Sequence, residues 1–244
     1  MLRNAFLSGF AWLGFAVTAQ AITADELVAK NIDAHGGMAH IQAIKTLKFE
    51  GKLVFDGGVE LAYINLRKAP DKVRNEGTMQ GLTAVQAYDG KDAWQIQPFG
   101  GRKDPERLSA DDAKPLANGA DLVNGLVDAK SRGDRVEYQG TEDVDGTDAY
   151  KLKLTRKNGA VTYYFLDPDY FLEVRSLDSL VLRGVSVETE TDYGDYEKVD
   201  GVYLPFSTAS GAKGSPQKQR LVVNKAQANV PLDDAQFAFP AVTK

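Results

Sequence analysis

Most of the chain alternates between apolar and polar residues with a period of two. In the stretch LKFEGKLVF, residues 47–55, leucines and phenylalanines alternate with lysines and a glutamate. This pattern is typical of a strand that buries one face. The same period recurs between turn residues along the chain, so we expect an antiparallel sheet of ten or more strands. The expected strands are 47–55, 59–68, 72–78, 82–88, 93–98, 135–141, 149–156, 160–166, 172–177, 182–193, 202–209 and 219–225.

Two regions, residues 23–44 and residues 100–133, have helical periodicity instead, and the first contains a capping box. Thr23 and Glu26 have the spacing of a capping box, and the apolar residues that follow repeat at helical intervals as far as Gly36 and Gly37. This predicts an amphipathic helix, followed by a short turn over 38–44. Both histidines of the chain lie here, and we interpret them as helix-end residues.

The segment 100–133 interrupts the strand pattern. Ser109 is expected to begin a short helix that Pro115 ends. A second helix is predicted over 118–130, because four apolar residues form one stripe at helical spacing. These residues, which we expect to cover a cavity as a helical lid, are Leu122, Val123, Leu126 and Val127.

Three similar phrases mark turns: AYDGKDAW at 87–94, DVDGTDAY at 143–150 and KVDGVYLP from 198. Asp-Gly supplies the positive φ angles of a type I′ turn, whose twist matches that of the strands it joins. We therefore predict three hairpin corners. The aromatic residue after each of the first two, Trp94 or Tyr150, then begins one face of the following strand.

The first 21 residues resemble a secretory signal peptide. They contain an early arginine, a short apolar run and the small residues Ala19 and Ala21 around a cleavage site. A single domain over 22–244, located in the periplasm and not attached to the membrane, is the expected product. The chain has no cysteine, which excludes disulfides and a lipid-modified cysteine, and its net charge of −5 argues against binding nucleic acid.

Catalytic and metal-binding motifs are not recognisable. His35 and His40 lack the neighbouring carboxylates of the usual zinc motifs, and the acidic residues of 182–193 alternate as on a solvated strand face. We predict no catalytic residues, no metal and no cofactor. An enzyme that uses scattered acids is the least favoured alternative.

One face of the predicted sheet has more apolar residues than the few helices can cover. Each of these residues fits a plain core; together they also fit a partly unfilled apolar cavity that binds lipid. The candidate cavity residues are Leu61, Tyr63, Trp94, Ile96, Tyr150, Leu152, Leu154, Tyr163 and Phe165.

The stretch 66–99, which contains LRKAPDKVRNEG and VQAYDGKDAWQIQPF, resembles the signature of LolA-like proteins. The matching positions are Pro70, Arg74, Asp89, Gly90, Trp94, Pro98 and Phe99, and near the end Asp233, Phe237, Phe239 and Pro240. The GG after the first helix and the phrase GDYEKVDGVYLPF resemble the branch called outer membrane lipoprotein-sorting proteins. One position departs from the pattern: Ala69 stands where the carriers have an arginine, with Arg67 just upstream.

The resemblance implies a mainly β fold with helices (α+β), in which a curved antiparallel half-barrel and a helical lid enclose an apolar cavity. It implies a non-enzymatic carrier, expected to be a monomer, that moves a lipid or acylated lipoprotein between a donor and an acceptor at the membranes. A lipid- or protein-sensing module on the same fold is the alternative. Arg67 and Arg74 are the candidate gating residues.

Overall fold

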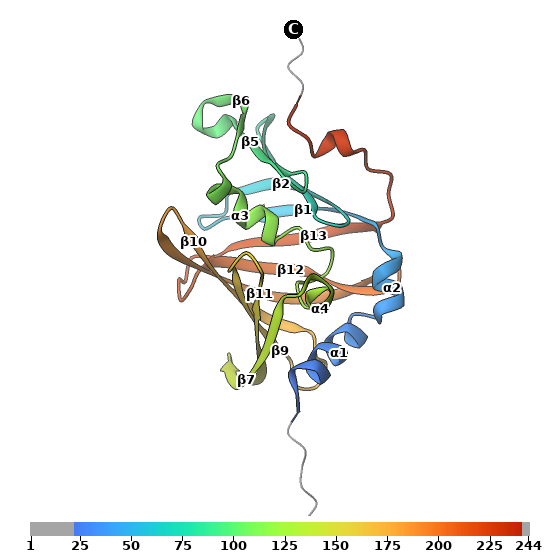
Figure 1. Ribbon diagram of the computed structural model, residues 1–244. Coiled ribbons are helices and arrows are strands. Elements are labelled where there is room, and N and C mark those ends of the chain that lie inside the picture. The colour runs from blue at the N-terminus through green and yellow to red at the C-terminus, as the bar shows by residue number, and fades with distance from the viewer. Residues whose placement is uncertain (1–21, 241–244) are drawn as a thin grey trace, which may run out of the picture.

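Thirteen antiparallel strands form one curved sheet in the computed structural model, which describes residues 22–240. The strand order is β6-β5-β4-β3-β2-β1-β13-β12-β11-β10-β9-β8-β7 (Figure 1). Neighbours in the sheet are neighbours in sequence except at the centre, where β1 pairs with β13. The first and last parts of the chain are thereby joined, and β6 and β7 become the two edges.

The elements occupy the following ranges. The helices are α1 (Ala24–Ala34), α2 (Met38–Ala43), α3 (Ala110–Asn118) and α4 (Ala129–Arg132), with two short 3-10 turns at Pro98–Gly100 and Asp234–Gln236. The strands are β1 (Thr46–Val54), β2 (Glu60–Lys68), β3 (Lys72–Met79), β4 (Leu82–Tyr88), β5 (Ala93–Gln97), β6 (Arg102–Arg107), β7 (Arg135–Val144), β8 (Thr147–Thr155), β9 (Val161–Leu166), β10 (Glu173–Leu182), β11 (Val185–Val199), β12 (Val202–Ala212) and β13 (Gln219–Ala228).

The connection from β6 to β7 crosses the whole sheet, because these strands lie at opposite edges. Helix α3, in the first part of this connection, contacts β3, β4 and β5 on one half of the sheet and β10 on the other. A helix of nine residues can reach both halves only because the sheet is strongly curved. The connection therefore lies over the concave face (Figure 1).

The core is divided among several clusters on this curved sheet. One cluster joins α2 to β1, β12 and β13 through Ile41, Leu47 and Leu204, and Leu122 and Val123 of the crossing connection pack against it. A second joins Leu27 of α1 to the leucines of β8 and includes Leu126 of the connection. The connection is thus fixed to two separate parts of the concave face.

The expected strands are confirmed, but β10 and β11 end five and six residues later than predicted, and the other ends differ by three residues or fewer. The structure adds β6, which the sequence pattern does not indicate because RKDPER is polar and contains Pro105. Proline is tolerated in this position because an edge strand leaves one row of backbone groups unpaired.

The two helix predictions for the connection are wrong in part. Pro115 lies inside α3 and does not end it, since contacts with both halves of the sheet, including Lys114 Nζ to the Val181 carbonyl at 3.0 Å, stabilise the helix. Residues 121–128 are not helical: 121–124 are irregular with a bend at 122–123, and 125–128 form a turn. The Asn124 side chain accepts hydrogen bonds from the backbone of Leu126 and Val127, a local pattern that competes with helix formation.

Two of the three Asp-Gly phrases form the predicted tight turns. Asp145 and Gly146 have φ angles of 51° and 89° between β7 and β8, and Asp200 and Gly201 have 46° and 90° between β11 and β12. Both pairs have the positive φ values of type I′ turns. At Asp89 the hairpin corner is confirmed, because β4 pairs with β5, but the tight turn is wrong. The loop spans 89–92, and the Asp89 carboxylate accepts from two backbone N–H groups.

Gly36 provides a direct test of how α1 is joined to the sheet. Its φ is 109°, and a Cβ atom there would lie 2.1 Å from the Gly201 carbonyl oxygen. Gly146 also has a positive φ, of 89°, but a Cβ there meets open space. We predict that Gly146→Ala lowers the free energy of unfolding by about 1–2 kcal/mol, the cost of the left-handed conformation. Gly36→Ala adds an overpacking cost of about 1–3 kcal/mol.

Urea denaturation of both variants and the wild type measures the difference. Equal loss of stability in the two variants would contradict the close approach of α1 to the β11–β12 turn.

Candidate functional site

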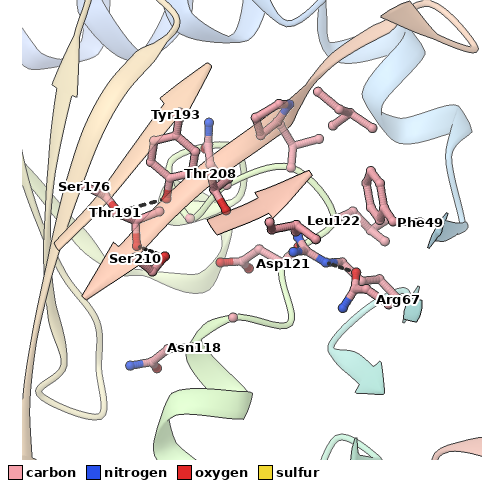
Figure 2. Close-up of a pocket in the computed structure, with 18 of the residues that line it drawn as sticks. Phe49, Arg67, Asn118, Asp121, Leu122, Ser176, Thr191, Tyr193, Thr208 and Ser210 are labelled. Atoms are coloured by element: carbon pink, nitrogen blue, oxygen red, sulfur yellow. Dashed lines mark hydrogen bonds between the residues drawn. The ribbon is translucent and has the colours of Figure 1, made fainter. Parts of the chain in front are cut away.

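A pocket of about 350 Å³ lies between the concave face of the sheet and the end of α3 with the turn that follows it (Figure 2). We call residues 118–125 the crossing segment. It lines the pocket with Asn118, Gly119, Asp121, Leu122, Val123, Asn124 and Gly125. The sheet contributes Phe49, Tyr63, Asn65, Arg67, Thr162, Tyr164, Ser176, Asp178, Thr191, Tyr193, Leu204, Pro205, Thr208, Ser210, Leu221 and Val223.

The two sides of the pocket differ in chemistry. Strands β1, β13 and the start of β12 provide an apolar wall, to which the crossing segment adds two side chains. Strands β9, β10, β11 and the later part of β12 provide a wall of hydroxyl groups and one carboxyl group, Asp178. Figure 2 shows Ser176, Thr191 and Ser210 on one side and Phe49 and Leu122 on the other. An occupant that satisfies both walls is amphiphilic.

Asp121 is the main attachment of the crossing segment. Arg67 Nη1 of β2 donates to the Asp121 backbone carbonyl at 2.7 Å. The Asp121 carboxylate accepts from Arg156 Nη2 at 2.6 Å and from Arg132 Nη1 at 3.0 Å. Strand β2 and the β8–β9 turn lie on different halves of the sheet, so this residue is held from both sides of the pocket.

A buried polar cluster provides a second attachment. The Nε2 atom of His35, the C-cap residue of α1, lies 2.9 Å from Glu173 Oε2, and both side chains are almost fully buried. The other oxygen of Glu173 accepts from Asn31 Nδ2 at 3.1 Å and from Asn124 Nδ2. Asn124 belongs to the crossing segment. The cluster therefore connects α1, β10 and the crossing segment.

His35 and Glu173 form a buried ion pair. Burial by itself lowers the pKa of His35, but the adjacent Glu173 carboxylate outweighs it and raises that pKa above the usual 6.5. Burial likewise favours the neutral form of Glu173, but His35 and the hydrogen bonds from its neighbours hold the pKa of this carboxyl at about 2. When both nitrogen atoms of its ring are protonated, His35 donates from Nε2 to Glu173 and from Nδ1 to the Tyr203 carbonyl, 2.6 Å away.

The structure brings some of the sequence-predicted residues to the pocket. Tyr63, Arg67, Leu122 and Val123 line it. Leu152 and Leu154 face the same side of the sheet but are fully buried beneath α1 and Leu126, and Tyr150 packs beside them. Val127 packs against the cluster that contains Ile41 of α2, and Leu61 is buried on β2. These residues form core next to the pocket.

Of the nine candidate cavity residues only Tyr63 lines the pocket, and four of the others lie on the opposite face of the sheet. Trp94 packs against Phe239 of the C-terminal segment, and Ile96 belongs to the same cluster. Trp94 Nε1 donates to the Phe237 carbonyl at 2.8 Å. Tyr163 and Phe165 pack in a separate cluster with Leu177. Since Ala93 and Tyr164, one position away, face the concave side, these four side chains point to the opposite face.

Arg74, the other gating candidate, does not line the pocket either. It pairs with Glu76 at 2.6 Å and donates to the Gln236 carbonyl at 2.8 Å, so it fastens the C-terminal segment.

Sequence reasoning missed the polar wall and the buried cluster. A signal for the wall is present: Thr162 and Tyr164, Ser176 and Asp178, and Thr191 and Tyr193 each repeat at period two. The adjacent residues Arg175, Glu190 and Asp192 point to the other face of the sheet. There they form ion pairs with one another or with Lys218. Asn31, Asn124 and Glu173 come from distant parts of the chain, so no local pattern indicates their contact.

Within residues 22–240, no group of three or more histidines, cysteines or acids is arranged to hold a metal ion. In the same range, none of the helices is long and apolar enough to cross a membrane. The predicted signal peptide, residues 1–21, lies outside the described residues.

Comparison with solved structures identifies the architecture. A DUF1329 family protein from Desulfovibrio piger is similar over 88% of this chain and 97% of its own, with a TM-score of 0.60 and 16% identity. A LolA superfamily protein from Nitrosomonas europaea is similar over 89% and 98%, with a TM-score of 0.59 and 17% identity. This chain has a LolA-like fold. A domain named as an outer membrane lipoprotein-sorting protein, from Vibrio parahaemolyticus, gives a TM-score of 0.58 at 11% identity over 87% and 94%.

The resemblance inferred from the sequence is therefore confirmed at the level of the fold. At the level of sequence, no protein-family model matches the chain, and no curated protein matches it. The LolA-like fold is an open curved sheet with a few helices, as the strand order here shows.

The buried ion pair predicts a specific dependence of stability on pH. A group whose pKa is raised by folding stabilises the protein below its unfolded pKa, and this stabilisation is lost as the pH rises through the folded value. We predict that the free energy of unfolding falls as the pH rises above 6.5, the usual His pKa, because His35 loses its proton. The Glu173 contribution is lost only as the pH falls from 4.5 towards about 2.

Urea denaturation across this pH range measures the effect. His35→Gln leaves Glu173 buried without its cation, so we expect a loss of about 3–5 kcal/mol near pH 6, where the pair is charged. The fall above pH 6.5 should disappear in the variant. A wild-type stability that stays constant or rises there would contradict a charged pair.

Proposed function

We propose that this protein is a non-enzymatic periplasmic carrier that holds a lipid, or an acyl chain of a lipoprotein, in the pocket for transfer towards the outer membrane. The observation that carries the proposal is a pocket with an apolar wall beneath a crossing segment that polar contacts attach to both halves of the sheet. Similarity to a LolA superfamily protein and to a lipoprotein-sorting domain supports it. The carrier is the domain over 22–244, released by cleavage after residue 21.

The need for such a pocket follows from the hydrophobic effect. Each CH₂ group moved from an apolar site into water costs about 0.8 kcal/mol, so a long acyl chain does not leave a membrane unaided at a useful rate. Phe49, Leu204 and Val223 offer the chain an apolar surface. At about 30 Å³ for a group the size of water, a volume of about 350 Å³ holds roughly a dozen groups. The pocket volume therefore fits part of one acyl chain and is too small for three chains.

In this proposal, entry and release of the lipid require the crossing segment to move, because this segment lines the pocket opposite the sheet. One of its contacts is suited to reversible opening. Arg67 forms one hydrogen bond to a backbone carbonyl, which can break and form again without any rearrangement of the β-sheet. We propose Arg67 as the gating residue that compensates for Ala69, which follows the last residue of β2.

Lipid transfer tests the proposal. Protein loaded with a fluorescent fatty acid is mixed with acceptor vesicles, and the rate of release is recorded for wild type, Arg67→Leu and Lys68→Leu. Loss of a hydrogen bond from a charged group costs about 1.5–3 kcal/mol, so Arg67→Leu should release its cargo about ten-fold faster or more. Lys68 serves as the matched control because it points to the other face, where it binds the Leu232 carbonyl and Asp234.

Melting curves accompany the assay to show that both variants are folded. Equal release by all three proteins would contradict the gating role, and failure of the wild type to take up any lipid probe would contradict the carrier function itself.

A further inference from the structure

A continuous row of hydroxyl groups crosses four strands in the floor of the pocket. Tyr164 pairs with Ser176, Ser176 with Thr191, and Thr191 with Ser210 in the registers of β9, β10, β11 and β12. Directly paired residues share one face of a sheet, and all four line the pocket. We call them the hydroxyl row. At roughly 4.8 Å per strand it extends about 14 Å. Thr162 and Asp178 lie beside it as a further pair.

The hydroxyl row has hydrogen-bonding capacity that the protein does not use. Thr191 Oγ1 lies 2.8 Å from Ser210 Oγ, and Ser176 Oγ lies 2.9 Å from the Tyr193 hydroxyl. Each such pair shares one hydrogen, so one further hydrogen and several lone pairs are free in each. Among the described residues the buried Nδ2 atom of Asn118, at the other side of the pocket, has no hydrogen-bond partner. Unused donors and acceptors both face the same space.

The charged groups around the pocket already have hydrogen-bonding partners. Asp121 is already paired with Arg132 and Arg156, and Arg67 is occupied by the Asp121 carbonyl and Asn65. The Asp178 carboxyl accepts from Thr162 Oγ1 at 2.6 Å, and no cation within salt-bridge distance balances it in the part of the chain described. Burial raises the pKa of Asp178, although the hydrogen bond from Thr162 and the charge of Arg156 act in the opposite direction.

A plain acyl chain does not account for these groups. A chain laid along the polar wall would cover hydroxyl groups without hydrogen-bonding them, at a cost of about 1–3 kcal/mol for each group left unsatisfied. The apolar wall over β1 and β13 is the place for a chain. The polar wall, on the far side of the same pocket, then faces the other end of the molecule.

We propose that the hydroxyl row binds the uncharged, hydroxyl-bearing head group of a single-chain amphiphile whose hydrocarbon part lies along the apolar wall. This inference rests on the proposed carrier function and specifies its cargo: a neutral lipid head with several hydroxyl groups, and neither a carboxylate nor an ammonium group. Its hydroxyls both donate and accept, which matches the unused capacity of Thr191, Ser210 and Asn118.

Displacement of a hydrophobic dye by three probes tests the inference. Monolaurin, laurate and laurylamine share one saturated chain length and differ in the head group, which is hydroxylated, anionic or cationic. All are used below their critical micelle concentrations. We expect monolaurin to bind about ten-fold more tightly than laurate or laurylamine, the effect of one or two net hydrogen bonds.

A matched pair of variants locates the effect. Thr191→Val removes one hydroxyl of the row without changing the side-chain shape, and it should lower monolaurin affinity about three-fold to ten-fold while leaving laurate affinity unchanged. Thr189→Val makes the same change two positions away on the same face of β11, outside the pocket lining, and should leave the binding of both unchanged.

The outcomes distinguish failure of the head-group inference from failure of the proposed carrier function. Equal affinities for monolaurin and laurate, tightest binding of laurylamine, or identical behaviour of the two threonine variants would overturn the inference while leaving a lipid carrier in place. If the folded protein bound neither the dye nor any probe, the proposed carrier function would be overturned, and the inference with it.

Discussion

The topology imposes one constraint on which the rest of the molecule depends. The chain leaves the sheet at the edge strand β6 and enters it again at the opposite edge, β7. The intervening residues must cross the full width of a curved sheet, and the concave side is the short way. A polypeptide placed there needs partners for its backbone groups, because the face beneath it is buried. The pocket and its attachments are consequences of this crossing.

The crossing segment is not a regular helix, so polar side-chain contacts hold it in place. Asp121 is held by arginines from both halves of the sheet, and Asn124 joins the buried pair of His35 and Glu173. Side-chain contacts of this kind fix a short irregular segment in position without filling the space below it. A longer helix with an apolar stripe would have packed into that space and closed the pocket. The irregular segment is therefore the reason that a pocket with two chemically different walls exists.

The sequence predicts the architecture much better than the site. Strand periodicity and the turns at Asp145 and Asp200 are local properties, so the sheet follows from them. Which face becomes concave is not local. In β9 both faces are aromatic, and in β5 the larger residues, such as Trp94, point to the side that the C-terminal segment covers. The apolar stripe at Leu122 and Leu126 predicted a helix, but these side chains serve two different clusters.

The central claim is that the pocket under the crossing segment exists to hold an amphiphile. The most direct measurement is native mass spectrometry of the protein purified without detergent from the cells that make it. The account predicts one bound lipid-sized molecule for each chain, lost on denaturation and reduced in amount when Arg67 is replaced by leucine. A cooperatively folded protein that is always empty, with or without Arg67, would contradict the account.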